Sequence, residues 1–152
     1  MRNILIVISA LLFLFVITSC GESINTTGDP RQAVINFFGA MQDNDTTAVA
    51  HYLDFKALMS QTGADYALST TDEPRSFKTP QEIILDLVDG GLTKGRWFSM
   101  QRVVGDAEQN LDSALVEVSF IDKRTDKQYF TKFGLRKINE AWKIYSFKTL
   151  TR

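Results

Sequence analysis

The strongest constraint on the fold of this chain is a change in its hydrophobic period. As far as Val88, apolar residues recur at the spacing of helices, whereas from Arg96 onward apolar and polar residues alternate. The first pattern gives a helix one apolar side, and the second gives a strand one apolar face. Helices followed by successive strands predict an α+β domain with helices packed on an antiparallel sheet. The 152 residues are 44% hydrophobic, which is enough for one core.

The helical part has recognisable starts and ends. Asp29 and Pro30 are typical of an N-cap and a first helical position, and an apolar stripe follows as far as Met41. A second helix is expected either to continue or to restart before Met59, and a third ends at Gly90–Gly91. The expected helical ranges are 30–41, 46–59 and 80–89.

About four strands are expected after the helices, in the ranges 96–105, 112–121, 128–138 and 141–149. Asn139–Glu140 predicts a two-residue turn between the last two, which places Ile138 opposite Ala141. Continued alternation then places Gly134 opposite Tyr145, whose ring is expected to fill the space beside the glycine.

The first residues predict an export signal. A run of 14 residues, 4–17, has no charge and follows Arg2. It is short for a membrane-spanning helix, which needs about 20 apolar residues. It suits the apolar region of a secretory signal peptide, so residues 1–19 are left out of the fold.

Residues 17–20, Ile-Thr-Ser-Cys, resemble the lipobox of bacterial lipoproteins, and Cys20 is the only cysteine. The resemblance implies a diacylglyceryl thioether on Cys20, cleavage before it, and acylation of the new amino terminus, with palmitate as a typical chain. Gly21 follows in place of the Asp that retains enteric lipoproteins in the inner membrane. The implied location is the cell envelope, at the outer membrane if the source has two membranes. The alternatives are an uncleaved anchor or a buried free thiol.

The expected organisation is a signal peptide at 1–19, a lipidated flexible tether at 20–29 and a single domain at 30–152. The stretches 29–53 and 114–144, the latter ending in Trp142-Lys143-Ile144, resemble small bacterial lipoproteins of unknown function. Those proteins belong to the nuclear-transport-factor-2-like, cystatin-like superfamily. The resemblance implies a curved antiparallel sheet wrapped around helices as a cone. Its members include isomerases, dehydratases and ligand binders.

Alternation along the last hairpin divides its side chains between two faces. One face, with Phe133, Leu135, Trp142 and Ile144, is expected to pack on the helices. The other is the candidate binding face, made of Phe130, Lys132, Arg136, Lys143, Tyr145 and Phe147.

Residues 123–152 contain nine basic and two acidic residues, against seven and sixteen in residues 20–122. We hypothesise that the candidate binding face docks an anionic envelope component or a protein partner. The alternatives are a solvated face shielded by long basic side chains or a homodimer contact. Nucleic acid is not expected outside the cytoplasm.

His51 is the only histidine and lies three residues before Asp54. In one helix these two would meet, and Asp54 could orient His51 as a general base. The competing interpretation, which we favour, is a partly exposed helix histidine. Asp86 and Asp89 are expected on a solvated helix face. One histidine and one lipidated cysteine predict no metal site, and no cofactor motif is present.

The sequence therefore predicts a membrane-anchored envelope lipoprotein whose domain binds a ligand or protein partner without catalysis. One alternative is a small enzyme of the dehydratase or isomerase type that uses His51 and Asp54. The other is a structural dimeric spacer. Only the first requires a contiguous exposed patch, and only the second requires ionisable groups converging on a cavity.

Overall fold

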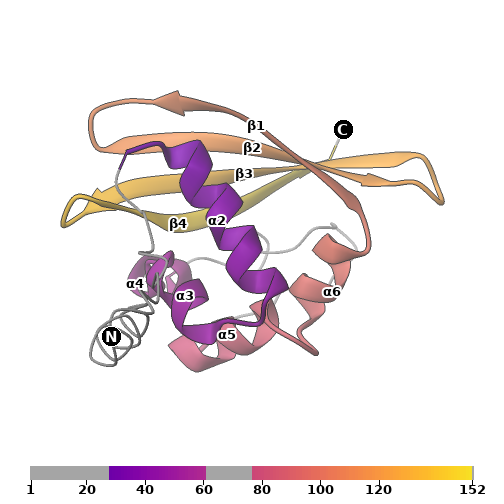
Figure 1. Cartoon of the computed structure of the whole chain (residues 1–152), viewed down its shortest axis with the longest axis horizontal. Coiled ribbons are helices and arrows are strands. Elements are labelled where there is room, and N and C mark those ends of the chain that lie inside the picture. The colour runs from indigo at the N-terminus through magenta and orange to yellow at the C-terminus, as the bar shows by residue number, and fades with distance from the viewer. Residues whose placement is uncertain (1–27, 61–76, 152) are drawn as a thin grey trace, which may run out of the picture.

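A computed structural model describes residues 28–60 and 77–151, so Cys20 and the expected signal peptide lie outside the described residues. The helices are α2 (Pro30–Gln42), α3 (Thr46–His51), α4 (Phe55–Met59), α5 (Pro80–Leu87) and α6 (Leu92–Phe98). The strands are β1 (Gln101–Gln109), β2 (Ser113–Asp122), β3 (Lys127–Ile138) and β4 (Ala141–Thr151). They form one antiparallel sheet in the order β1-β2-β3-β4 (Figure 1). The α+β prediction is confirmed.

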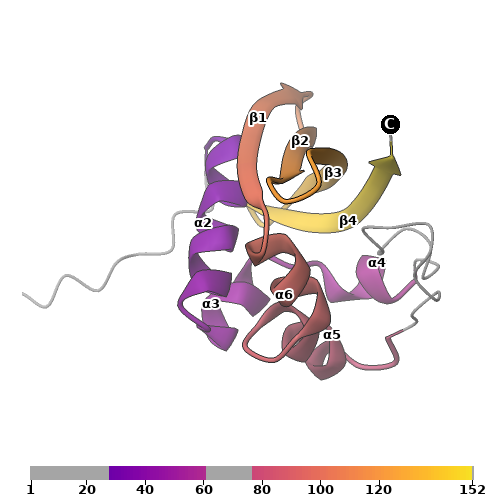
Figure 2. The same ribbon diagram turned by 90° about the vertical axis from the view of Figure 1, so that its right-hand side faces the viewer.

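The helices gather beside a strongly curved sheet (Figure 2). Helix α2 begins as expected, because the Asp29 carboxylate accepts a hydrogen bond of 2.8 Å from the backbone N–H of Arg31 and Pro30 follows it. Its apolar stripe packs against β1 and β2.

The start of the domain is fixed to β4, because the Trp142 indole N–H donates to the Gly28 carbonyl at 2.9 Å. No helix in the described ranges is long and apolar enough to cross a membrane.

Aromatic side chains fill the space between the helices and the sheet. The Phe133 and Phe147 rings meet edge to face at 5.1 Å between centroids, and Trp97 stacks on Phe120 at 5.5 Å. All four side chains are at most 1% exposed. Such packing stabilises the fold by apolar burial and by the geometry of the ring pairs. The expected cone is therefore occupied by protein at this level of the sheet.

The prediction of a first strand over 96–105 is wrong at its start, because residues 92–98 form α6. This helix buries Trp97, which a two-residue period had placed in a strand.

The expected solvated position of Asp86 is also wrong. The Asp86 carboxylate is buried and accepts bonds from the Thr93 backbone N–H, at 3.2 Å, and from the Thr93 hydroxyl, at 2.5 Å. Asp86 thus ties α5 to the first turn of α6.

The β3–β4 hairpin confirms the two-residue turn, with φ values of 51° at Asn139 and 65° at Glu140. The register follows prediction as far as Leu135 opposite Ile144. An extra residue, Tyr145, then interrupts β4. Beyond this bulge Gly134 pairs with Ser146 and Phe133 pairs with Phe147.

The bulge corrects the expected face of Phe147. One extra residue reverses the alternation after it, so Phe147 enters the core, where it is 0% exposed. Phe147 is therefore not part of the candidate binding face.

Candidate functional site

The face of the sheet opposite the core, called here the outer face, is the surface that holds most of the candidate binding residues. Strand pairing aligns Leu115 with Gly134 and Glu117 with Lys132 across β2 and β3. Every described side chain of this face keeps contact with solvent, and Val103 and Leu115 are 47% and 39% exposed. Its larger side chains are Val103, Leu115, Ile121, Phe130, Lys132, Arg136, Lys143 and Tyr145.

Two basic residues of this face, Arg136 and Lys143, have polar partners within the domain. Arg136 forms an ion pair with Asp54, and the neighbouring Lys143 ammonium donates to the His51 carbonyl. Lys132 lies directly opposite Glu117. Another basic residue, Lys137, lies on the core side of the sheet, with its ammonium 5.2 Å from the Trp142 ring centroid. The positive charge of the C-terminal segment is thus divided between the two sides of the sheet.

His51 and Asp54 do not share a helix, so the alternative in which they pair along one helix does not apply. Helix α3 ends at His51, and Asp54 caps the separate helix α4 by accepting a 3.2 Å bond from the Ala57 N–H. Between them, Leu53 forms a parallel bridge with Ile144 at the β4 edge. The bridge brings Asp54 beside the outer face, where its carboxylate is 6% exposed and paired with Arg136.

Burial lowers the pKa values of two basic groups beside this bridge, His51 and Lys143. Burial, and then the positive charge of Lys143, lower the pKa of His51. Burial also lowers the pKa of Lys143, and the negative charge of Asp54 opposes that shift. His51 itself is exposed, and the described Asp54 contacts are those of a helix cap and an ion pair with Arg136. The arrangement holds α3 and α4 on the edge of the sheet.

Tyr145 forms part of a hollow at the same end of the strands, since its lining residue Ser113 pairs with Arg136. A Cβ atom on Gly134 would lie 2.7 Å from the Tyr145 Cζ atom, so the ring lies directly over the glycine. The prediction that Tyr145 fills the space beside Gly134 is therefore confirmed, although the bulge has changed the pairing. The hollow has a volume of about 470 Å³ and is lined by Glu108, Gln109, Asn110, Ser113, Ala114, Leu115 and Tyr145.

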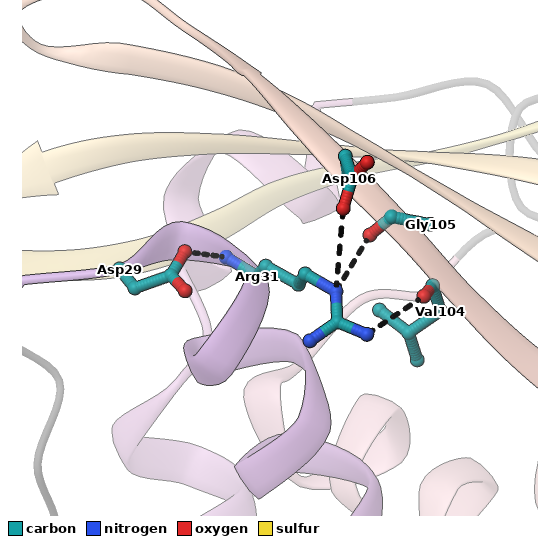
Figure 3. Close-up of polar contacts among 5 residues, drawn as sticks. All are labelled: Asp29, Arg31, Val104, Gly105 and Asp106. Atoms are coloured by element: carbon teal, nitrogen blue, oxygen red, sulfur yellow. Dashed lines mark hydrogen bonds and ion pairs between the residues drawn. The ribbon is translucent and has the colours of Figure 1, made fainter.

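A second bulge, in β1, places Glu108 beside the same hollow. The strand contains one extra residue between Val104 and Ala107, so Glu108 lies opposite Leu115 on the outer face. The Arg31 guanidinium holds the bulge by donating to the carbonyl oxygens of Val104, at 3.2 Å, and Gly105, at 3.1 Å (Figure 3). Alternation along the sequence did not predict that Glu108 lies beside the hollow, since Gly105 was the only local signal of an irregular strand.

A further hollow of about 500 Å³ lies where the end of α6 meets the β2–β3 turn. Within the turn, Asp122 accepts bonds from the Thr125 hydroxyl and the Arg124 N–H, and these bonds lower the pKa of Asp122. The carboxylate therefore serves the turn. The lining residues are Ser99, Gln101, Ile121, Asp122, Lys123 and Arg124.

The described part of the chain contains no group of three or more histidine, cysteine or acidic residues that could hold a metal ion.

No protein-family model matches the sequence, and no curated protein matches it. A solved structure from Streptomyces avermitilis, described as a candidate dehydratase of the nuclear-transport-factor-2-like family, superposes with a TM-score of 0.49. The two chains are 16% identical, and the match covers 80% of this chain and 92% of the other.

Proposed function

We propose that this chain is a lipid-anchored protein of a bacterial envelope whose domain binds a ligand or a protein partner through the outer face, without catalysis. The observation that carries this proposal is the contrast between the two sides of the sheet. The core side is occupied by buried aromatic rings, whereas the outer face leaves Val103 and Leu115 in contact with solvent, 47% and 39% exposed. Apolar side chains that line one hollow beside polar groups, as Leu115 and Tyr145 do, are typical of an interaction surface.

The anchoring part of the proposal depends on Cys20 and the residues that follow it. The lipobox-like segment precedes a short polar stretch, and Gly28 is held by the Trp142 indole N–H. The attachment to the membrane and the first fixed point of the domain would then be only a few residues apart. Two or more acyl chains at Cys20 hold a protein stably on a bilayer, whereas one gives marginal binding.

Mass spectrometry of the full chain from cell membranes tests the anchor. We expect a mature amino terminus at Cys20 that carries a diacylglyceryl group and an additional acyl chain. Cys20→Ala should keep the signal segment joined and lack the lipid mass. A native chain that begins at Met1, or a Cys20 without a glyceride, would contradict the anchor.

Photo-cross-linking of the full chain in intact cells tests the binding face. A cross-linking amino acid at Glu117 should give defined products, and Val103→Asp or Leu115→Asp should abolish them. Leu85→Asp is the matched control, because Leu85 is 55% exposed on α5 and lies away from the sheet. Equal cross-linking in all variants would contradict the proposed face. A turnover that disappears in His51→Ala would contradict the absence of catalysis.

A further inference from the structure

Two irregularities in the sheet direct side chains to the same place. The bulge in β4 releases Tyr145 from the pairing and lays its ring over Gly134, while the bulge in β1 turns Glu108 to the outer face. Bulges often re-aim a side chain beside a functional site. These two lie in opposite edge strands, and both of the side chains they move line the hollow of about 470 Å³.

The lining of this hollow has two chemically distinct parts. The Tyr145 ring and the Leu115 side chain, 39% exposed, provide an apolar surface. Around it stand side chains with amide, hydroxyl and carboxylate groups, which can both donate and accept hydrogen bonds. These are Glu108, Asn110 and Ser113, whereas Gln109 pairs with the core-side residue Ala114.

The rim of the hollow is fixed by backbone hydrogen bonds. The Asn110 N–H donates to the Ser113 carbonyl at 2.8 Å and closes the β1–β2 turn. The Lys137 N–H donates to the Asp112 carbonyl at 2.9 Å and ties that turn to β3. A rim held in this way loses little conformational entropy when a ligand binds.

We propose that this hollow binds a pyranose unit of a neutral saccharide. A pyranose has an apolar C–H face, which stacks on an aromatic ring, and hydroxyl groups around its edge. The Tyr145 ring supplies the stacking surface, and the Asn110 carboxamide together with the Glu108 carboxylate binds the hydroxyls. The lining contains one acidic and no basic residue in the described part of the chain, which favours a neutral sugar over an anionic one.

This proposal names a ligand class for the outer face and therefore rests on the proposed function. Titration calorimetry of the acylated full chain is the test, in a detergent without a sugar headgroup. The probes are N,N′,N″-triacetylchitotriose, cellotriose and maltotriose. We expect saturable binding of at least one of them, and Tyr145→Ala should weaken it about tenfold or more.

Matched variants separate stacking from a change in the fold. Tyr145→Trp should retain the affinity, and Leu85→Ala, a truncation of an exposed side chain on α5, should leave it unchanged. Gly134→Ala should weaken binding, because the new methyl group displaces the Tyr145 ring. Circular dichroism confirms that each variant is folded.

Two results would overturn the saccharide site. One is an absence of binding by all three probes at about 10 mM, and the other is equal affinity of the parent chain and folded Tyr145→Ala. Binding of a peptide at the hollow without binding of any saccharide would also overturn the saccharide site. If the outer-face cross-links persist in either case, only the saccharide class fails. If the parent chain and the Val103→Asp and Leu115→Asp variants cross-link equally, the proposed function itself is contradicted.

Discussion

The guanidinium of Arg136 on β3 forms an ion pair with the Asp54 carboxylate, which is 6% exposed and caps α4. The pair joins a strand of the outer face to a helix that is distant in sequence. A buried carboxylate requires such a partner, because an uncompensated charge costs several kcal/mol. Asp54 therefore serves the fold, and its neighbour His51 ends the preceding helix in an exposed position.

Replacing Asp54 with Ala is expected to lower the free energy of unfolding by about 2 kcal/mol, because a helix cap and an ion pair are both lost. The estimate is reduced because the Arg136 side chain is 46% exposed. Asp45→Ala removes only the cap of α3 and should cost about 1 kcal/mol. Urea denaturation measures both. Equal costs, or no coupling in a double-mutant cycle of Asp54→Ala with Arg136→Met, would refute the role of the ion pair.

Two glycines near α6 should respond oppositely to a methyl group. A Cβ atom on Gly91 would lie 2.2 Å from the Asp86 carbonyl oxygen, so Gly91→Ala must push α5 and α6 apart. We expect a loss of about 2 kcal/mol or more. A Cβ atom on Gly95 would meet nothing within 4 Å beyond the backbone of its own helix, so Gly95→Ala should stabilise by about 0.5–1 kcal/mol. Thermal unfolding of the two variants checks the contrast. A change of stability in the same direction in both variants would contradict the close contact at Gly91.

The stability of the domain should fall slightly on mild acidification because of His51. Burial and then Lys143 hold the folded pKa of this imidazole below its ordinary value of 6.5. The unfolded chain therefore binds the proton more readily, and stability is lost as the pH falls from about 6.5 through the folded pKa. The loss should be a fraction of a kcal/mol, because the ring is exposed and solvent screens it.

The measurement is the melting temperature at several pH values between 5 and 7.5, for the parent chain and His51→Asn. His51 is the only histidine, so the difference between the two curves isolates it. A parent chain that becomes more stable than the variant on acidification would show that the sign is wrong.

Local sequence signals predicted the features that depend on a few neighbouring residues. The cap at Asp29, the proline starts of α2 and α5, and the turn at Asn139–Glu140 all stand where expected. Each depends on a backbone conformation that particular side chains favour. The split between α3 and α4 was left open, because the Leu53–Ile144 bridge that accompanies it joins residues far apart in the sequence.

The outer face was predicted less well, because alternation assumes a strand without bulges. The unpaired residue Tyr145 leaves no distinctive mark in the residues around it. It nevertheless moves Phe147 from the outer face to the core side. Gly134 carried a partial signal, since a glycine inside a strand often marks an irregular pairing. The contribution of Glu108 depends on the β1 bulge that Arg31 holds, a contact over more than 70 positions. Only the assembled sheet reveals that relationship.

The bulge itself can be tested by comparing two neighbouring aromatic residues of β4. Phe147 is 0% exposed and packs against Phe37 and Phe133, so Phe147→Ala should lower the free energy of unfolding by about 3–5 kcal/mol. Tyr145→Ala removes a half-buried ring from the outer face and should cost about 1 kcal/mol, since Gly134 leaves little side chain to pack against. Uninterrupted alternation would instead place both residues on the outer face, with similar small costs. Chemical denaturation of the two variants therefore distinguishes the registers, and comparable values near 1 kcal/mol would contradict the bulge.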